Sequence, residues 1–171
     1  MGNVNTQDGI GWTKLHRAAL YGQYEEVRRL VESGADVNIR NMHEMTAVME
    51  AAMEGHRVIV EYLHQAGADI NIKDKNGMTA MMWAADKGHG DIVQYFHQAG
   101  TDINIIRNTD GKSALHLAVE SGHSDIVQYL TQAGADISIR NYFGISALDV
   151  VRNMRHGSAL LQYLTQVNDE I

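Results

Sequence analysis

Apolar and polar residues follow one another in a block of about 33 residues that recurs along the chain. Within residues 74–106, an apolar run at 80–85 follows Thr79 and stops before Gly88. A second run at 91–99 places apolar side chains at i, i+1 and i+4, which is one face of a helix. The pattern predicts two short helices in each block, joined by a glycine turn and followed by a polar turn.

The block occurs five times. Residues 51–73 and 84–106 are identical at 15 of 23 positions without a gap. Helices of this length are marginally stable alone, and each unit buries its apolar face only against its neighbours. The prediction is therefore a single all-α repeat solenoid. We place a seven-residue N-terminal extension at 1–7 and the five units at about 8–40, 41–73, 74–107, 108–140 and 141–171.

Short motifs recur in register within these units. They are Thr-x-Leu-His at 13–16, Ser-x-Leu-His at 113–116, Gly-His at 55–56 and 88–89, and Gly-Ala-Asp-Ile-Asn at 67–71. With the 33-residue period, these motifs resemble the ankyrin repeat family. The resemblance implies helix-turn-helix units with β-hairpin or turn fingers. It also implies a non-catalytic protein that binds partners in a concave groove.

Charge and composition argue against several classes of function. The 171 residues include 14 basic and 21 acidic side chains, for a net charge of −7, which argues against a surface that grips nucleic acid or an anionic membrane. The absence of cysteine excludes disulfides and thiolate metal sites. No apolar run reaches the ~20 residues of a membrane span. We expect a cytoplasmic monomer without a cofactor, a metal site, a nucleic-acid partner or a transmembrane segment.

Nine histidines raise the question of metal binding or catalysis. Eight of them fall at three repeat positions, which hold His56, His89, His123 and His156, then His16 and His116, then His64 and His97. Equivalent positions in stacked units lie roughly 10 Å apart, too far to share one zinc ion. No HExxH, GxSxG or phosphate-loop motif occurs. We predict that the histidines hydrogen-bond turns between units, and that the protein is not an enzyme.

A basic residue precedes the polar turn of each later unit. This row consists of Arg40, Lys73, Arg107 and Arg140. One interpretation is a ridge of charge at the fingers that receives an acidic partner. The interpretation we favour is a solvated edge whose charge is offset by neighbouring Asp and Asn side chains, because four cations in an acidic protein grip phosphate weakly.

The first residues, Met-Gly-Asn-Val-Asn-Thr, fit the pattern for N-acylation at Gly2. One myristoyl chain gives only marginal membrane attachment, and the basic tract that usually strengthens it is missing here. The pattern keeps open an acylated, membrane-anchored form of the protein.

The family resemblance also implies which positions line the groove. Carried over by register, the candidate partner-binding residues are Trp12, Leu20, Tyr21, Met45, Met53, Met78, Lys112 and Ile145. We expect five of them to form one apolar binding patch in the first three units, namely Trp12, Tyr21, Met45, Met53 and Met78. The alternative is that flexible methionine side chains fill the core, as we expect for Met81, which holds the motif leucine position.

The sequence thus predicts a protein–protein interaction module that acts through its concave groove and fingers. One alternative is an inhibitor or regulator of a specific enzyme. Another is a scaffold, or a secreted effector that manipulates a host, held at a membrane by acylation.

Overall fold

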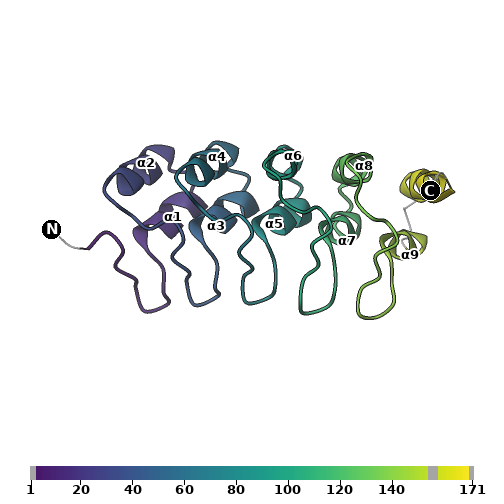
Figure 1. Ribbon diagram of the computed structural model, residues 1–171, viewed down its shortest axis with the longest axis horizontal. Helices are drawn as coiled ribbons and strands as arrows, with labels where there is room; N and C mark the ends of the chain where they lie inside the picture. Colours follow the sequence, from purple (N-terminus) through teal and green to yellow (C-terminus); the bar gives the residue numbers. More distant parts are fainter. Residues whose placement is uncertain (1–2, 154–157, 170–171) are drawn as a thin grey trace.

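The computed structural model describes residues 3–153 and 158–169, and these form an elongated stack of helix pairs (Figure 1). The helices are α1 (Lys14–Leu20), α2 (Tyr24–Glu32), α3 (Ala47–Met53), α4 (Arg57–Gln65), α5 (Ala80–Lys87), α6 (Gly90–Gln98), α7 (Ala114–Glu120), α8 (Ser124–Gln132), α9 (Ala147–Arg152) and α10 (Ser158–Asp169). The all-α repeat solenoid predicted from the sequence is confirmed.

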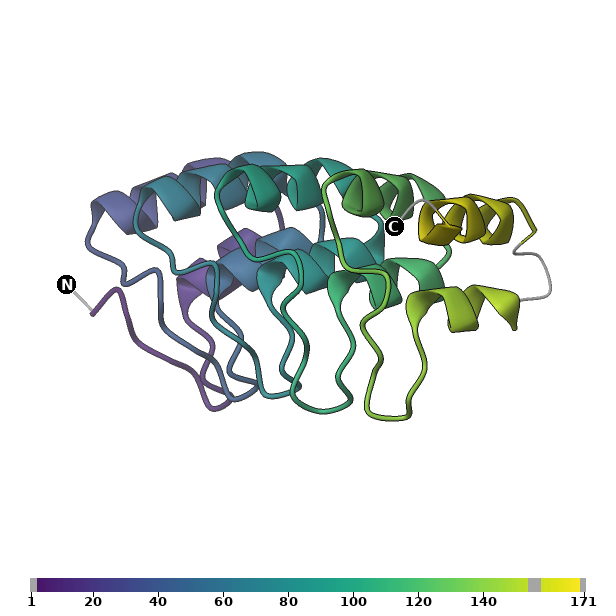
Figure 2. The same cartoon turned by 45° about the vertical axis from the view of Figure 1, so that its right-hand side comes forward.

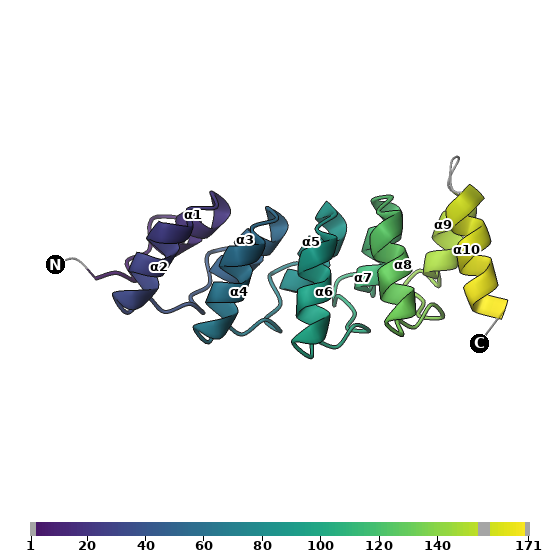
Figure 3. The ribbon, with the colours of Figure 1, turned by 90° about the horizontal axis from the view of Figure 1, so that it is seen from above.

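The helices form two parallel rows. The odd-numbered helices pack side by side in one row, and each even-numbered helix packs on the helix that precedes it in the chain. Viewed from above, the even-numbered helices follow one another along the stack (Figure 3). The core runs along the interface of the rows, where Val60, Val93, Val127 and Leu164 are fully buried. Met81 is buried there as well, as predicted.

The Thr/Ser-x-x-His motif caps the N-terminus of α1 and of α7. The Thr13 hydroxyl accepts the His16 amide N–H, while His16 Nδ1 accepts the Thr13 amide N–H at 3.2 Å. Ser113 and His116 make the same reciprocal pair. These bonds satisfy amide groups that the first turn of a helix leaves without partners. The Thr/Ser-x-x-His spacing therefore fixes where these two helices begin.

Between units, the chain forms five loops that project beside the odd-numbered helices (Figure 2). We call them fingers 1 to 5, which comprise residues 8–12, 41–45, 74–78, 107–112 and 141–145. In fingers 1, 2, 3 and 5 an Asn or Asp side chain accepts the amides two and four residues later. In the described part of the chain the fingers are turns, with two isolated bridges, Ile106 to Ser113 and Arg140 to Ser146.

Residues 3–7, which we predicted as an extension, make the contacts that end a repeat unit. Asn5 Oδ1 accepts the Asp36 amide at 2.9 Å, and Gln7 Nε2 donates to the Arg40 carbonyl at 3.0 Å. The equivalent bonds in later units are Asn38 with Asp69, Asn104 with Asp136, Arg40 with Lys73, and Lys73 with Ile106. The segment therefore covers the first helix pair in the manner of a preceding unit.

One finger residue has an unfavourable backbone conformation. Glu44 has φ of 60°, where fingers 1, 3, 4 and 5 have glycine, and it is the one non-glycine residue with positive φ in residues 3–153 and 158–169. A side chain in this region costs about 1–2 kcal/mol. We expect Glu44→Gly to raise the free energy of unfolding by about 1 kcal/mol, measured by urea denaturation.

The control for this prediction is Glu44→Ala. Both variants remove the exposed ion pair of Glu44 with Arg40, which contributes little. Only glycine relieves the backbone, so the alanine variant should show no gain in stability. Equal stability of the two variants would mean that the positive φ carries no cost.

Candidate interaction surface

The predicted partner-binding residues do not form one exposed patch. Met45 is 8% exposed and Met78 is 2% exposed, so both belong to the core. Arg107 from the next finger covers Met78, with its Nη1 3.4 Å from the methionine sulfur. The predicted patch that joins Trp12, Tyr21, Met45, Met53 and Met78 is therefore wrong, because stacked fingers bury two of its members. Methionine at these two positions fills the core.

The other predicted residues reach the surface to different extents. Tyr21 is 65% exposed and Ile145 is 39% exposed, whereas Leu20 and Met53 are half-buried. Trp12 is half-buried, and the Arg17 guanidinium lies 5.6 Å from the centre of its ring. Lys112 forms an ion pair with Glu120 at 2.8 Å, and so does not present a free charge.

Exposed apolar side chains concentrate on the fingers. Seven large apolar residues are exposed in the described ranges, namely Ile10, Tyr21, Met42, Val58, Tyr142, Phe143 and Ile145. Five of them lie in fingers 1, 2 and 5, and Tyr21 follows the end of α1. Only Val58 lies on an even-numbered helix. Exposed apolar groups therefore gather on the side of the solenoid formed by the fingers and the odd-numbered helices.

The predicted basic row is bonded to the chain itself. Arg40 pairs with Glu44, Arg107 with Asp110, and Arg140 with Asp149. Lys73 Nζ donates to the Ile106 carbonyl and to Asn108 Oδ1. The guanidinium of Arg107 holds the pKa of Asp110 at about 2, so this pair stays charged at all physiological pH values. These contacts favour the solvated edge over a ridge of free charge.

The histidines bond neighbouring units, as predicted. The ring Nε2 atoms of His56, His89 and His123 lie 3.0 Å from the carbonyls of Leu20, Met53 and Asp86, each more than 30 residues away. His16 reaches the Met45 carbonyl, and His116 that of Ile145. Burial lowers the pKa of His16 and of His116, which keeps both rings neutral at pH 7. His156 lies outside the described residues.

Two further histidines join the even-numbered helices. The Nδ1 atoms of His64 and His97 lie 2.8 Å from the hydroxyls of Tyr95 and Tyr129 in the next unit. Across residues 3–153 and 158–169, no three His, Asp or Glu side chains converge in a way that could hold a metal ion.

A buried carboxyl group on α3 was not predicted. Glu50 is 1% exposed and accepts one hydrogen bond, from Asn41 Nδ2 at 3.2 Å. Loss of hydration, with a smaller contribution from the charge of Glu54, raises its pKa to about 7. The same repeat position holds Arg17, Trp83 and Leu117. The only signal in the sequence was this change of residue type at one position.

A family model described as ankyrin repeats (3 copies) matches residues 1–74 and again residues 48–141. This chain belongs to the ankyrin repeat family. Ankyrin repeats are generally protein–protein interaction modules, and the family is typically non-catalytic. No curated protein matches the chain. Among the residues described, none of the ankyrin helices is both long and apolar enough to cross a membrane.

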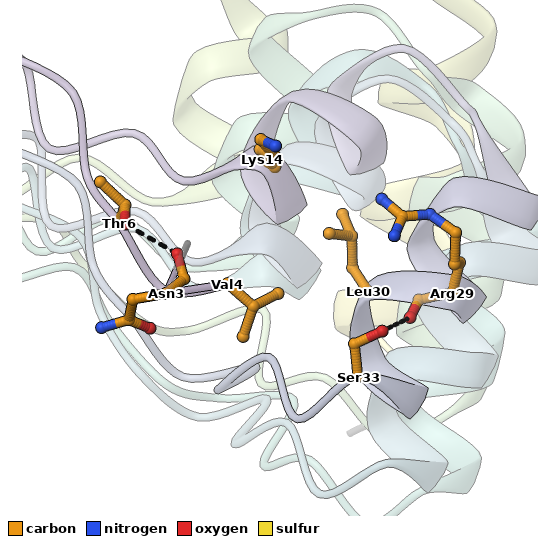
Figure 4. Close-up of a pocket in the computed structure, with 7 residues that line it drawn as sticks. All are labelled: Asn3, Val4, Thr6, Lys14, Arg29, Leu30 and Ser33. Atoms are coloured by element: carbon orange, nitrogen blue, oxygen red, sulfur yellow. Dashed lines mark hydrogen bonds between the residues drawn. The ribbon is translucent and has the colours of Figure 1, made fainter. Parts of the chain in front are cut away.

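The first ankyrin unit carries a cavity of about 740 Å³ between its N-terminal segment and α2 (Figure 4). Asn3, Val4 and Thr6 line one side of it, and Arg29, Leu30 and Ser33 line the other. Arg29 is bonded to Glu26 on its own helix. Gly2, where the first residues fit the acylation pattern, lies outside the described residues.

Proposed function

We propose that this ankyrin repeat protein binds a partner protein along the surface formed by its fingers and odd-numbered helices, which we call the inner surface. The observation that supports this best is the position of the exposed apolar side chains. Six of the seven lie on the inner surface or at its edge, and one lies on an even-numbered helix. Exposed apolar groups that gather on one side of a soluble protein are characteristic of interaction sites.

The polar groups of the inner surface fit a role in specificity. Glu54 and Lys87 are exposed at the ends of α3 and α5, and Arg17 is exposed on α1. Charges at the rim of an interface guide the partner into register and contribute little affinity. The aromatic and methionine side chains are the groups we expect to supply most of the binding free energy.

The proposal predicts a difference between the two sides of the solenoid. Once a partner has been captured from native lysate by the intact chain and purified, Tyr21→Ala and Met42→Ala should each weaken its binding. We expect a loss of about 1–3 kcal/mol in the binding free energy, measured by calorimetry. Val58→Ala is the matched control, because Val58 is equally exposed on α4 and should have no effect. Loss of binding in the control alone would place the partner on the even-numbered helices.

The same purified partner distinguishes the alternatives. If it is an enzyme whose activity falls on binding, the protein acts as an inhibitor and not as an adaptor. The mass of the intact protein from its native source tests for acylation at Gly2.

A further inference from the structure

We infer that the outer edge of finger 5 binds an extended, acidic segment of a partner protein, in the place that a sixth finger would occupy. The inference rests on the proposed function, and it assigns one part of the inner surface a ligand of defined chemistry. Three kinds of contact link neighbouring fingers elsewhere in the stack. At finger 5 each of them lacks a neighbouring finger among the described residues.

The first observation concerns the hydrogen bonds between fingers. The Met42 amide donates to the Ile10 carbonyl, the Lys75 amide to the His43 carbonyl, and the Tyr142 amide to the Asp110 carbonyl, at 2.8–3.2 Å. Between fingers 3 and 4, the Thr109 hydroxyl donates to the Asn76 carbonyl at 3.0 Å. The Phe143 carbonyl holds the equivalent position in finger 5 and has no partner among the described residues. An extended segment alongside it would donate an amide to this carbonyl.

The second observation is the exposure of apolar side chains at this edge. Ile145 is 39% exposed, whereas Met45 and Met78 at the same repeat position are buried. Phe143 is 75% exposed and lies at the tip of the same finger. A segment in the place of a sixth finger would cover both side chains. Removal of their apolar surface from water would favour binding.

The third observation is an excess of positive charge. Arg40 and Lys73 each donate to a carbonyl of the following unit. Arg140 donates to the Gly144 carbonyl of its own finger, as Arg40 does to the Glu44 carbonyl, but its other bond goes to Asp149 Oδ2 at 2.8 Å. Arg152 bonds the other oxygen of Asp149 at 3.3 Å. Two exposed guanidinium groups thus share one carboxylate, which leaves one positive charge for a carboxylate of the ligand.

The two arginines and Asp149 lie beside a cleft of about 280 Å³. Arg140, Asp149 and Arg152 line it together with the apolar side chains of Ile137 and Leu148. An Asp or Glu side chain that enters the cleft would bond the arginines, while apolar neighbours in the segment pack on Phe143 and Ile145. The ligand therefore carries an acidic side chain with apolar side chains beside it.

The first unit disfavours a second copy of this chain at the same place. Residues 3–7 already cover its helix pair in the manner of a preceding unit, because Asn5 Oδ1 accepts the Asp36 amide and Gln7 Nε2 donates to the Arg40 carbonyl. The last unit of another copy could stack there only if it displaced this segment. A separate acidic segment meets no such obstacle.

The test uses a displayed library of random peptides, each about 12 residues long, selected on the intact protein. We expect the selected peptides to combine Asp or Glu with apolar residues. Phe143→Ala and Arg140→Ala should each weaken their binding by at least about tenfold, whereas Val58→Ala, an exposed position on α4, should leave it unchanged. Because Phe143 and Arg140 are exposed, both variants should melt as the parent does.

Three results would overturn the inference. They are a selection that yields no binding peptide, peptides whose affinity Phe143→Ala does not change, and self-association in sedimentation that Phe143→Ala abolishes. The proposed function is tested separately, by the effect of Tyr21→Ala and Met42→Ala on a captured partner. That effect can be present when the peptide selection fails, and it can be absent when the selection succeeds.

Discussion

Replacement of Glu50 by Gln should stabilise the protein at pH 8 and have little effect on stability at pH 4. Glu50 is buried, with one hydrogen bond from Asn41, and its pKa is raised from 4.5 to about 7. Ionised Glu50 in the folded protein therefore lacks the hydration that it has in the unfolded chain. Gln keeps the shape of the side chain and an oxygen that accepts the Asn41 hydrogen bond, and it never carries the charge.

The direction of the pH dependence follows from the raised pKa. Below pH 4.5 the carboxyl group is protonated in both states, and its contribution to stability is fully present. Between pH 4.5 and 7 the unfolded state loses this proton first, so the folded state loses stability as the pH rises. The whole shift corresponds to about 3 kcal/mol above pH 7. Glu50→Gln should recover most of this amount at pH 8.

The measurement is urea denaturation of both proteins from pH 4 to pH 8. The ionisable groups on the helices packed against α3 include His16 and Arg17 on α1, and Asp86 and Lys87 on α5. They are the same in both proteins, so the difference in the free energy of unfolding isolates Glu50. Glu54→Gln is the control, because Glu54 is exposed and should change stability far less. A difference that does not vary with pH would show that Glu50 titrates normally.

Replacement of Gly55 by Ala should destabilise the protein by about 2–4 kcal/mol. Gly55 has φ of +80°, and a Cβ atom there would lie 2.6 Å from Cε1 of the His89 ring. The ring would have to move, and His89 Nε2 would lose its 3.0 Å contact with the Met53 carbonyl. The loss of this hydrogen bond between units adds to the cost of the left-handed backbone.

Gly100→Ala is the matched control. Gly100 has φ of +87°, but a Cβ atom there would meet nothing within 4 Å. Its replacement should cost only the backbone strain, about 1 kcal/mol. Thermal and urea denaturation of the two variants therefore separate the strain from the packing of the histidine ring. Equal losses would mean that the ring moves aside without cost.

Local features of the sequence were sufficient to predict the repeat and the positions of its helices. The Thr-x-x-His motif predicts where α1 begins, because its two side chains cap the first turn. The Gly-His motif predicts the turn between the two helices of a unit. In the structure the histidine ring of this motif bonds a carbonyl of the preceding unit. Spacing alone also excluded a zinc site shared by histidines of one row, since equivalent positions are a full repeat apart.

The exposure of a repeat position was decided by the tertiary structure. Met45, Met78 and Ile145 are equivalent in sequence, yet the two methionines are buried and Ile145 is exposed at the last finger. Glu50 and Arg17 are also equivalent, yet Glu50 is buried and Arg17 is exposed. In a solenoid, the atoms that cover a side chain come from a unit about 33 residues away, and each unit has different side chains. The sequence by itself therefore determined the repeat, its helices and its turns, whereas only the stacked structure decided which side chains face water.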